Sequence, residues 1–146
     1  MGKRRDARET ALQFLVARDL NREFNDEDTA AFWQLLECSN SARTMGEALV
    51  TEFEPFREEI DGRIDTVTQN YELERLSTVD RNILRIAAFE MFHCLDIPPI
   101  VSINEAIEIA KRFGTEESGR FVNGVLDRLK GALDRPLRQA STSSGS

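Results

Sequence analysis

The chain has 146 residues, of which 40% are hydrophobic and 31% are charged, and its net charge is −7. This length suits one domain, and the hydrophobic fraction is too high for a disordered chain. No apolar stretch approaches the ~20 residues that span a bilayer, and the basic start is not followed by the apolar segment of a secretory signal. We therefore expect a cytosolic protein with no membrane partner.

The sequence holds few of the residues that metal sites and catalytic sites need. Its two cysteines, Cys38 and Cys94, belong to no C-x-x-C pair, and His93 is the only histidine. We interpret the cysteines as ordinary, partly buried thiols. No glycine-rich phosphate loop, G-x-S-x-G motif or H-E-x-x-H motif occurs. We therefore expect a protein that is not an enzyme, with no catalytic residues, no metal and no cofactor.

Charge is distributed unevenly along the chain. Segment 23–80 holds most of the surplus acid, whereas the first eight residues include Lys3, Arg4, Arg5 and Arg8. Positive side chains at the start of a helix oppose the helix dipole, so helix stability does not explain them. Two interpretations remain open. The basic turn is either a frayed, solvated terminus or an anion-binding end, where amide and guanidinium groups meet a phosphate.

Apolar residues recur at spacings of three and four along most of the chain, which predicts an all-α fold of about seven helices. The first helix is expected at about 4–21, with its apolar face starting at Ala7. The next helices are expected around 32–36, at about 42–53, and through Ile60 and Ile64. A break is expected at Pro55, because proline cannot continue a helix.

The fifth helix is expected at about 78–95, and its apolar residues on nearly all sides indicate a central, buried position. Ser77 stands three residues before Asp80, which is the spacing of a helix cap and its partner. The helices are predicted to form two helical sub-bundles that share one core, in a domain over residues 1–135. The polar tail at 136–146 is expected to be disordered.

Two more helices are predicted after Pro98 and Pro99. The sixth is expected to begin at a capping box of Ser102 and Glu105, and to end with Gly114 in the left-handed conformation. Thr115 is expected to cap the seventh. The pair Asn123-Gly124 disfavours a helix locally, so we expect the glycine to let another backbone of the fold approach closely.

Three sequence blocks resemble the C-terminal part of the NusB family of transcription antitermination factors. They are Asp80-Arg81 followed by ILRIAAFE, INEAIEIAKRFG at 103–114, and RFVNGVLD at 120–127. The segment KRRDARETALQ at 3–13 is similar to the arginine-rich first helix of that family. The resemblance therefore covers most of the chain, with the segment around 21–55 as its divergent part.

The resemblance implies a helical protein that pairs with the ribosomal protein NusE and binds the single-stranded boxA element of ribosomal operon transcripts. It would act on the RNA polymerase elongation complex indirectly. Carried onto this sequence, the resemblance implies RNA contacts at the basic start and at the last helix, namely Lys3, Arg4, Arg5, Arg8, Glu117, Arg120 and Phe121. It implies contacts with NusE at Val16, Glu74 and Asp80. Relatives often have an aromatic residue in place of Val16, so part of this interface departs from the family pattern.

Each assignment has a plain alternative. Phe121 can be a core aromatic, and Asp80 can be an acid that the helix dipole favours at a helix start. Two alternative functions also remain open. The chain can be a protein-only helical adaptor or homodimer with weak RNA affinity, dominated by the acidic segment 23–80. It can also be a fragment of a ribosomal RNA methyltransferase, whose front domain is related to this family.

Overall fold

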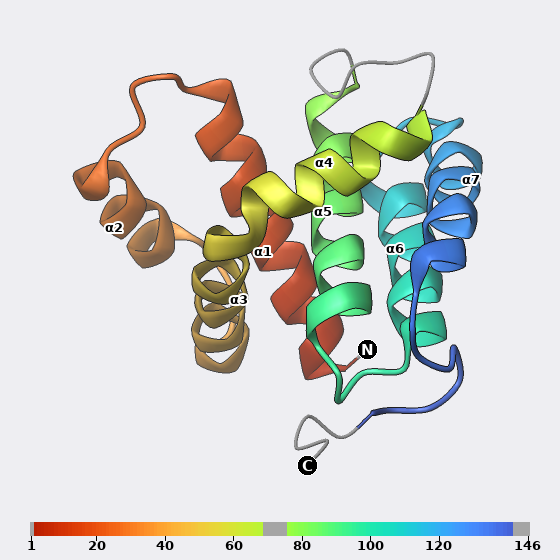
Figure 1. Cartoon of the computed structure of the whole chain (residues 1–146). Helices are drawn as coiled ribbons and strands as arrows, with labels where there is room; N and C mark the ends of the chain where they lie inside the picture. The colour runs from red at the N-terminus through yellow and green to blue at the C-terminus, as the bar shows by residue number, and fades with distance from the viewer. Residues whose placement is uncertain (1, 69–75, 142–146) are drawn as a thin grey trace. The chain divides into compact units, whose positions relative to one another are not determined.

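The computed structural model describes residues 2–68 and 76–141, and all regular elements in these residues are helices (Figure 1). The all-α fold class is therefore confirmed. The chain divides into two compact units, the first ending at Pro55 and the second starting at Phe56. Within the described ranges, no helix combines the length and the apolar character that crossing a membrane requires.

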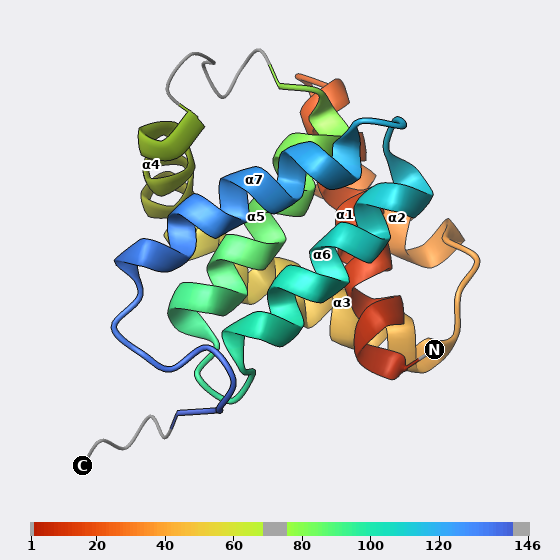
Figure 2. The same cartoon turned by 90° about the vertical axis from the view of Figure 1, so that its right-hand side faces the viewer.

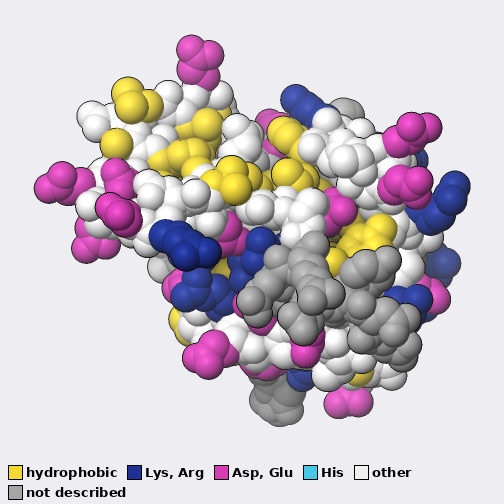
Figure 3. All heavy atoms as spheres, turned by 90° about the horizontal axis from the view of Figure 1, so that it is seen from above, with side chains coloured by type: hydrophobic (Ala, Val, Ile, Leu, Met, Phe, Trp, Pro, Cys, Tyr) yellow, Lys and Arg dark blue, Asp and Glu magenta, His cyan; other side chains and the backbone are white. Residues whose placement is uncertain are grey.

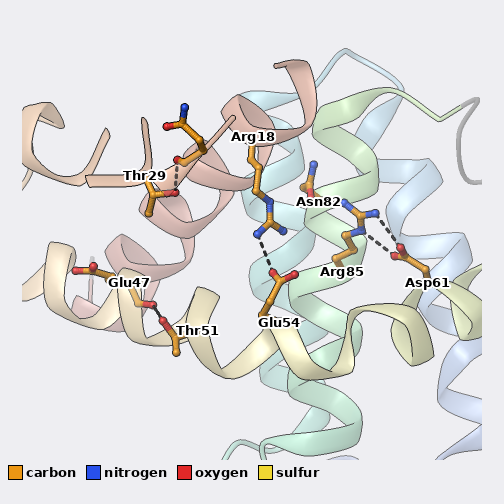
Figure 4. Close-up of polar contacts among 9 residues, drawn as sticks. Arg18, Thr29, Glu47, Thr51, Glu54, Asp61, Asn82 and Arg85 are labelled. Carbon is orange, nitrogen blue, oxygen red and sulfur yellow. Dashed lines mark hydrogen bonds and ion pairs between the residues drawn. The ribbon is translucent and has the colours of Figure 1, made fainter. Parts of the chain in front are cut away.

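The first unit contains α1 (Lys3–Leu20), α2 (Asp26–Leu35) and α3 (Asn40–Phe53), and a short 3-10 helix (Glu54–Phe56) follows at the expected proline break. The apolar face predicted for α1 is buried, and it includes Ala7, Ala11, Phe14 and Leu15. At the far end of α1, Arg18 donates a hydrogen bond to Glu54, with 2.8 Å between Nη1 and Oε1 (Figure 4).

Helices α1 and α3 approach closely at Gly46. A Cβ atom built on Gly46 would collide with the side chain of Thr10 and lie 3.2 Å from the carbonyl oxygen of Ala7. The hydroxyl of Thr10 occupies this space because it bonds backbone oxygens of both helices, at 3.0 Å from Ala7 and 3.2 Å from Ala42. The small residue on α3 is therefore what lets the two helices pack at this distance.

Helix α2 is attached to α1 by a cluster of aromatic rings. The ring of Phe14 on α1 stacks on Trp33 with 5.3 Å between centroids, and it meets Phe32 edge-on at the same distance. Arg43 on α3 fixes the end of α2, since its guanidinium donates to the carbonyl oxygens of Trp33 at 2.7 Å and Leu36 at 2.8 Å. These bonds satisfy backbone acceptors that a helix end leaves without partners.

The second unit contains α4 (Arg57–Thr68), α5 (Thr78–His93), α6 (Pro99–Phe113) and α7 (Ser118–Leu129), followed by a short 3-10 helix (Lys130–Ala132). Helix α5 contacts the other three helices, and Figure 2 shows α5, α6 and α7 side by side. Every residue from Asn82 to Met91 is buried, which confirms that α5 is the central helix of this unit. The side chain of Ser77 accepts a hydrogen bond from the amide of Asp80, as predicted for its cap.

Buried polar side chains connect α5 to its neighbours. Arg85 of α5 is directed at Asp61 of α4 and bonds both carboxylate oxygens (Figure 4). Glu90, which is 3% exposed, accepts a hydrogen bond of 2.6 Å from the hydroxyl of Ser102 on α6. Such bonds are needed because a buried polar group without a partner costs free energy.

Two predicted helix ends of α6 are wrong. The helix begins at Pro99 rather than at a Ser102–Glu105 capping box, because proline suits the first helical turn and Ser102 bonds Glu90 instead. Gly114 is not left-handed but extended, with φ −95° and ψ −164°. Its lack of a side chain is still required, since a Cβ there would collide with Ser118.

The segment after α7 returns to the end of α5. Arg135 donates hydrogen bonds to the carbonyl oxygens of Met91, Cys94, Leu95 and Ile97. Further along, the carbonyl oxygen of Leu137 accepts from the amide of Ile100 at 2.8 Å. The end of α5 is thus closed by a residue more than forty positions away, which no local sequence pattern indicates.

Candidate nucleic-acid interface

The basic start of α1 is helical from Lys3 onward. The N-cap residue is Gly2, which has no side chain that could accept hydrogen bonds from the amide groups of the first turn. Lys3 and Arg4 are exposed, and Arg5 is partly exposed. Amide groups at a helix start carry partial positive charge, and together with these side chains they favour an anion. Asp6 is exposed in the same turn, so one negative side chain accompanies the three positive ones. The remaining positive charge suits a phosphate group.

Arg8 differs from the other basic residues of this helix. Its side chain is only 4% exposed and lies on the buried part of α1 with Ala7, Glu9 and Thr10. A cation this deeply buried is poorly placed to reach the phosphates of an RNA strand. The position of Arg8 therefore argues against the predicted RNA contact, and we leave it out of the proposed interface.

The predicted RNA residues of the last helix share one face of α7. Glu117 and Arg120 are exposed, and Phe121 is partly exposed, at the border of the buried face. That buried face consists of Ser118, Val122, Val125, Leu126 and Leu129. Residues three and four positions apart are neighbours on a helix, so Glu117 adjoins both Arg120 and Phe121, whose own side chains point about 100° apart. The ring of Phe121 is thus neither fully buried in the core nor fully exposed.

The turn before α7 is fixed by Ser118 and brings in a basic residue that the sequence interpretation missed. The Ser118 hydroxyl oxygen accepts a hydrogen bond of 2.9 Å from the amide of Thr115. The Thr115 hydroxyl accepts one of 3.3 Å from the amide of Glu117, as predicted for a cap, and the regular helix follows from Ser118. Lys111 of α6 lies alongside, since a Cβ on Gly119 would be 3.4 Å from its Cγ. The side chain of Lys111 is 64% exposed. Its ammonium group places a positive charge beside the start of α7, where it is ion-paired with Glu108 at 3.4 Å.

The predicted contacts with a protein partner fall in three places. Val16 is partly buried on α1, and Asp80 is partly buried in the first turn of α5. One carboxylate oxygen of Asp80 is buried and has no hydrogen-bond partner among the described residues. Glu74 lies outside the described residues. The dipole explanation for Asp80 fits its place in the first turn, but it leaves that oxygen unexplained.

The two predicted groups of RNA contacts lie in different units, so their joint action remains a prediction. On the face drawn in Figure 3, basic and acidic side chains both occur in small, separate groups. Among the described residues, no cluster of three or more histidine, cysteine, aspartate or glutamate side chains is arranged to hold a metal ion.

The sequence profile of the NusB family matches residues 5–130. This chain belongs to the NusB family. Transcription antitermination protein NusB of Myxococcus xanthus is 43% identical over 140 residues, which cover 93% of this chain and 100% of that protein. The NusB protein of Bacillus mycoides is 47% identical over 131 residues, which cover 90% of this chain and 99% of that protein. The resemblance of the sequence blocks is therefore confirmed.

Solved structures of NusB proteins share the fold. NusB of T. maritima has a TM-score of 0.79 and 34% identity, with 92% of this chain and 94% of that chain covered. A crystal structure of antitermination factors NusB and NusE in complex with dsRNA contains a chain with a TM-score of 0.77 and 29% identity, covering 90% of this chain and 98% of that chain. The NusB match starts at Arg5, so Lys3 and Arg4 precede the matched region.

Proposed function

We propose that this chain is an RNA-binding transcription antitermination factor that works as a heterodimer with NusE. The observation that carries the proposal is the NusB match over residues 5–130, which includes the described α7 surface. The solved complex of NusB, NusE and dsRNA supports both kinds of partner. The mechanism is positional: the pair holds RNA near the elongating polymerase, and no covalent chemistry is required.

The RNA we propose is a single-stranded, boxA-like element of ribosomal operons, with contacts in each of the two units. Lys3, Arg4 and Arg5 would bind phosphates at the start of α1, as guanidinium groups and free amides bind anions. On α7, Arg120 would bind a further phosphate, and the partly exposed ring of Phe121 would stack on a base. Glu117 would lie at the rim of this surface.

The NusE contacts we propose are Val16, Glu74 and Asp80. Asp80 is partly buried in the first turn of α5. The part of its carboxylate that remains exposed can accept a hydrogen bond from NusE. An Asp80→Asn variant should therefore bind NusE more weakly while keeping the Ser77 cap, which uses only the backbone amide of residue 80.

A shift assay on boxA-like single-stranded RNA with added NusE tests the function. A Lys3→Ala, Arg4→Ala, Arg5→Ala variant should bind less tightly, whereas an Arg22→Ala, Arg138→Ala control, which removes exposed basic residues elsewhere, should bind like the unchanged protein. With about four basic contacts, the logarithm of affinity should fall with the logarithm of salt concentration at a slope near −3. If the unchanged protein with NusE does not bind the RNA, the function is wrong and a protein-only adaptor becomes the better explanation.

Three further expectations from the sequence are part of this proposal. They are a cytoplasmic location, one domain over residues 1–135 whose two sub-bundles share a core, and a disordered tail at 136–146. The hydrogen bond between Ile100 and Leu137 opposes disorder at the start of that tail. Limited proteolysis of the intact protein checks the domain prediction, because cleavage should occur first in the tail. Early cleavage between the two units would contradict a shared core.

A further inference from the structure

Gly124 lies in the middle of α7, yet the packing of the chain does not require a glycine there. A Cβ built on Gly124 would meet no heavy atom of a neighbouring segment within 4 Å, in contrast to Gly46 and Gly114. The prediction that another backbone of this fold approaches Gly124 is therefore wrong. Glycine weakens the interior of a helix, so this residue lowers the stability of α7 without improving its packing.

The neighbours of Gly124 on the helix surface are the residues of the proposed RNA site. Arg120 precedes it by four positions and Phe121 by three, so both lie one turn away on the same face. Arg128 follows by four positions, is exposed, and is held in place by a hydrogen bond of 3.1 Å from its guanidinium to the carbonyl oxygen of Val67. A bare turn of backbone thus lies between two arginines and beside an aromatic ring.

Gly62 in α4 shows that an open glycine alone is not informative. A Cβ on Gly62 would also meet nothing within 4 Å. Its neighbours one turn away are Glu58, Glu59 and Asp65, all exposed acids. That surface would repel a polyanion. The surface around Gly124 offers two cations, Arg120 and Arg128, against one exposed acid, Asp127, which is paired with Lys130. The charge around each glycine separates the two positions.

We infer that Gly124 is a contact point for RNA, where the missing side chain lets one nucleotide lie directly on the backbone of α7. This inference rests on the proposed function and extends its site by one helical turn. The base would lie against the ring of Phe121, and the flanking phosphates would reach Arg120 and Arg128. A side chain at position 124 would project into the space that the nucleotide occupies. The site would thus read the RNA by shape and stacking rather than by base-specific bonds.

The test is a Gly124→Gln variant with Gly62→Gln as its matched control. Both substitutions place the same neutral side chain in open space on a helix, and glutamine favours a helix more than glycine. Thermal unfolding followed by circular dichroism should therefore show both variants melting at or above the unchanged protein. The preformed heterodimer with NusE should bind boxA-like RNA about tenfold more weakly with Gly124→Gln, which is the loss of one stacked base. Gly62→Gln should leave that affinity unchanged.

The outcomes separate this inference from the function on which it rests. If Gly124→Gln binds RNA as tightly as the unchanged heterodimer, the inference is overturned and the proposed function stands. If it weakens only the binding of NusE, measured without RNA, position 124 contacts the protein partner and the inference is again overturned. If the unchanged heterodimer does not bind the RNA, both fail. A Gly124→Ala variant adds only one methyl group and should lose less affinity for RNA than Gly124→Gln. If Gly124→Ala binds RNA as tightly as the Gly62→Gln control, that result also counts against the inference.

Discussion

Arg85 on α5 and Asp61 on α4 form a two-pronged ion pair in which Nε lies 2.7 Å from Oδ1 and Nη2 lies 2.8 Å from Oδ2. The Arg85 side chain is 8% exposed and that of Asp61 is 24% exposed. Arg85 also donates to the side-chain oxygen of Asn82 at 3.0 Å, and Asn82 in turn donates to the carbonyl oxygen of Thr78. A chain of polar contacts therefore joins α4 to the first turns of the central helix.

Replacing Asp61 with asparagine should destabilise the protein by about 2 kcal/mol, because a buried guanidinium loses its charged partner. Urea unfolding followed by circular dichroism measures the change. The control is Asp65→Asn, one turn further along the same helix and exposed. A loss of stability no larger than that of the control would show that the ion pair contributes nothing net.

Glu59 should make stability depend on pH in the acid range. Burial raises the pKa of Glu59, but hydrogen bonds from Arg63 and His93 and their positive charges lower it more, so the net pKa lies below 4.5. A lowered pKa in the folded state contributes stability that is present at neutral pH and is lost as the pH falls below the ordinary value. Because the Glu59 side chain is 40% exposed, the contribution should be only about 0.5 kcal/mol.

A Glu59→Gln variant should therefore be slightly less stable than the unchanged protein at neutral pH and equally stable at a pH well below the pKa. Denaturant unfolding at several pH values measures the difference. Glu58→Gln, an exposed neighbour, should show no such convergence. A difference for Glu59→Gln that grows as the pH falls would contradict the sign of this prediction.

Gly46 and Gly62 should respond in opposite directions to the same substitution. Gly46→Ala should destabilise the protein by about 2 kcal/mol, because the added methyl group collides with Thr10 between α1 and α3. Gly62→Ala should stabilise it by up to about 1 kcal/mol, since the methyl group enters open space and alanine favours the helix. Thermal unfolding of both variants under one set of conditions is the measurement. If both variants change the stability in the same direction, α1 and α3 do not approach as closely as described.

Arg135 should stabilise the end of α5 from outside the helix. Arg135→Ala removes the donor for four carbonyl oxygens, which should cost about 2 kcal/mol. Arg138→Ala, an exposed arginine three residues later, is the matched control. Hydrogen exchange should also speed up in the last turn of α5 for Arg135→Ala alone. Unchanged exchange there would show that the helix end does not depend on this arginine.

The helices themselves were largely predictable because burial imposes a period on the sequence. The central position of α5 followed from its apolar residues on nearly all sides, and the cap at Ser77 followed from a local spacing. Helix ends that depend on distant residues were not predictable. Ser102 has the sequence context of a cap, but a long-range bond to Glu90 places it inside α6. A local sequence pattern cannot show that Ser102 bonds Glu90 instead of capping the helix.

The candidate site likewise has features that the sequence predicted and features that it did not. Glu117, Arg120 and Phe121 were named from the family resemblance, and the structure leaves all three at least partly exposed. The burial of Arg8 was missed, because a basic run suggests exposure while the period of α1 already placed Ala7 and Ala11 on the buried face beside it. Lys111 was missed because its proximity to α7 depends on the path of the turn around Gly114. The available signal for Lys111 was its place in the basic last turn of α6, just before the helix predicted to bind RNA.

Arg43 stabilises the end of α2 by donating hydrogen bonds to the carbonyl oxygens of Trp33 and Leu36, and it is synthesised after that helix. In a peptide of residues 25–35, the side chain of Asn25 could still cap α2 by accepting from the amide of Asp28. The other end of the helix would lack the hydrogen bonds from Arg43. On the ribosome, the carbonyl oxygens of Trp33 and Leu36 remain exposed to water until Arg43 has emerged. Helix α2 therefore reaches its full stability only after part of α3 has been synthesised.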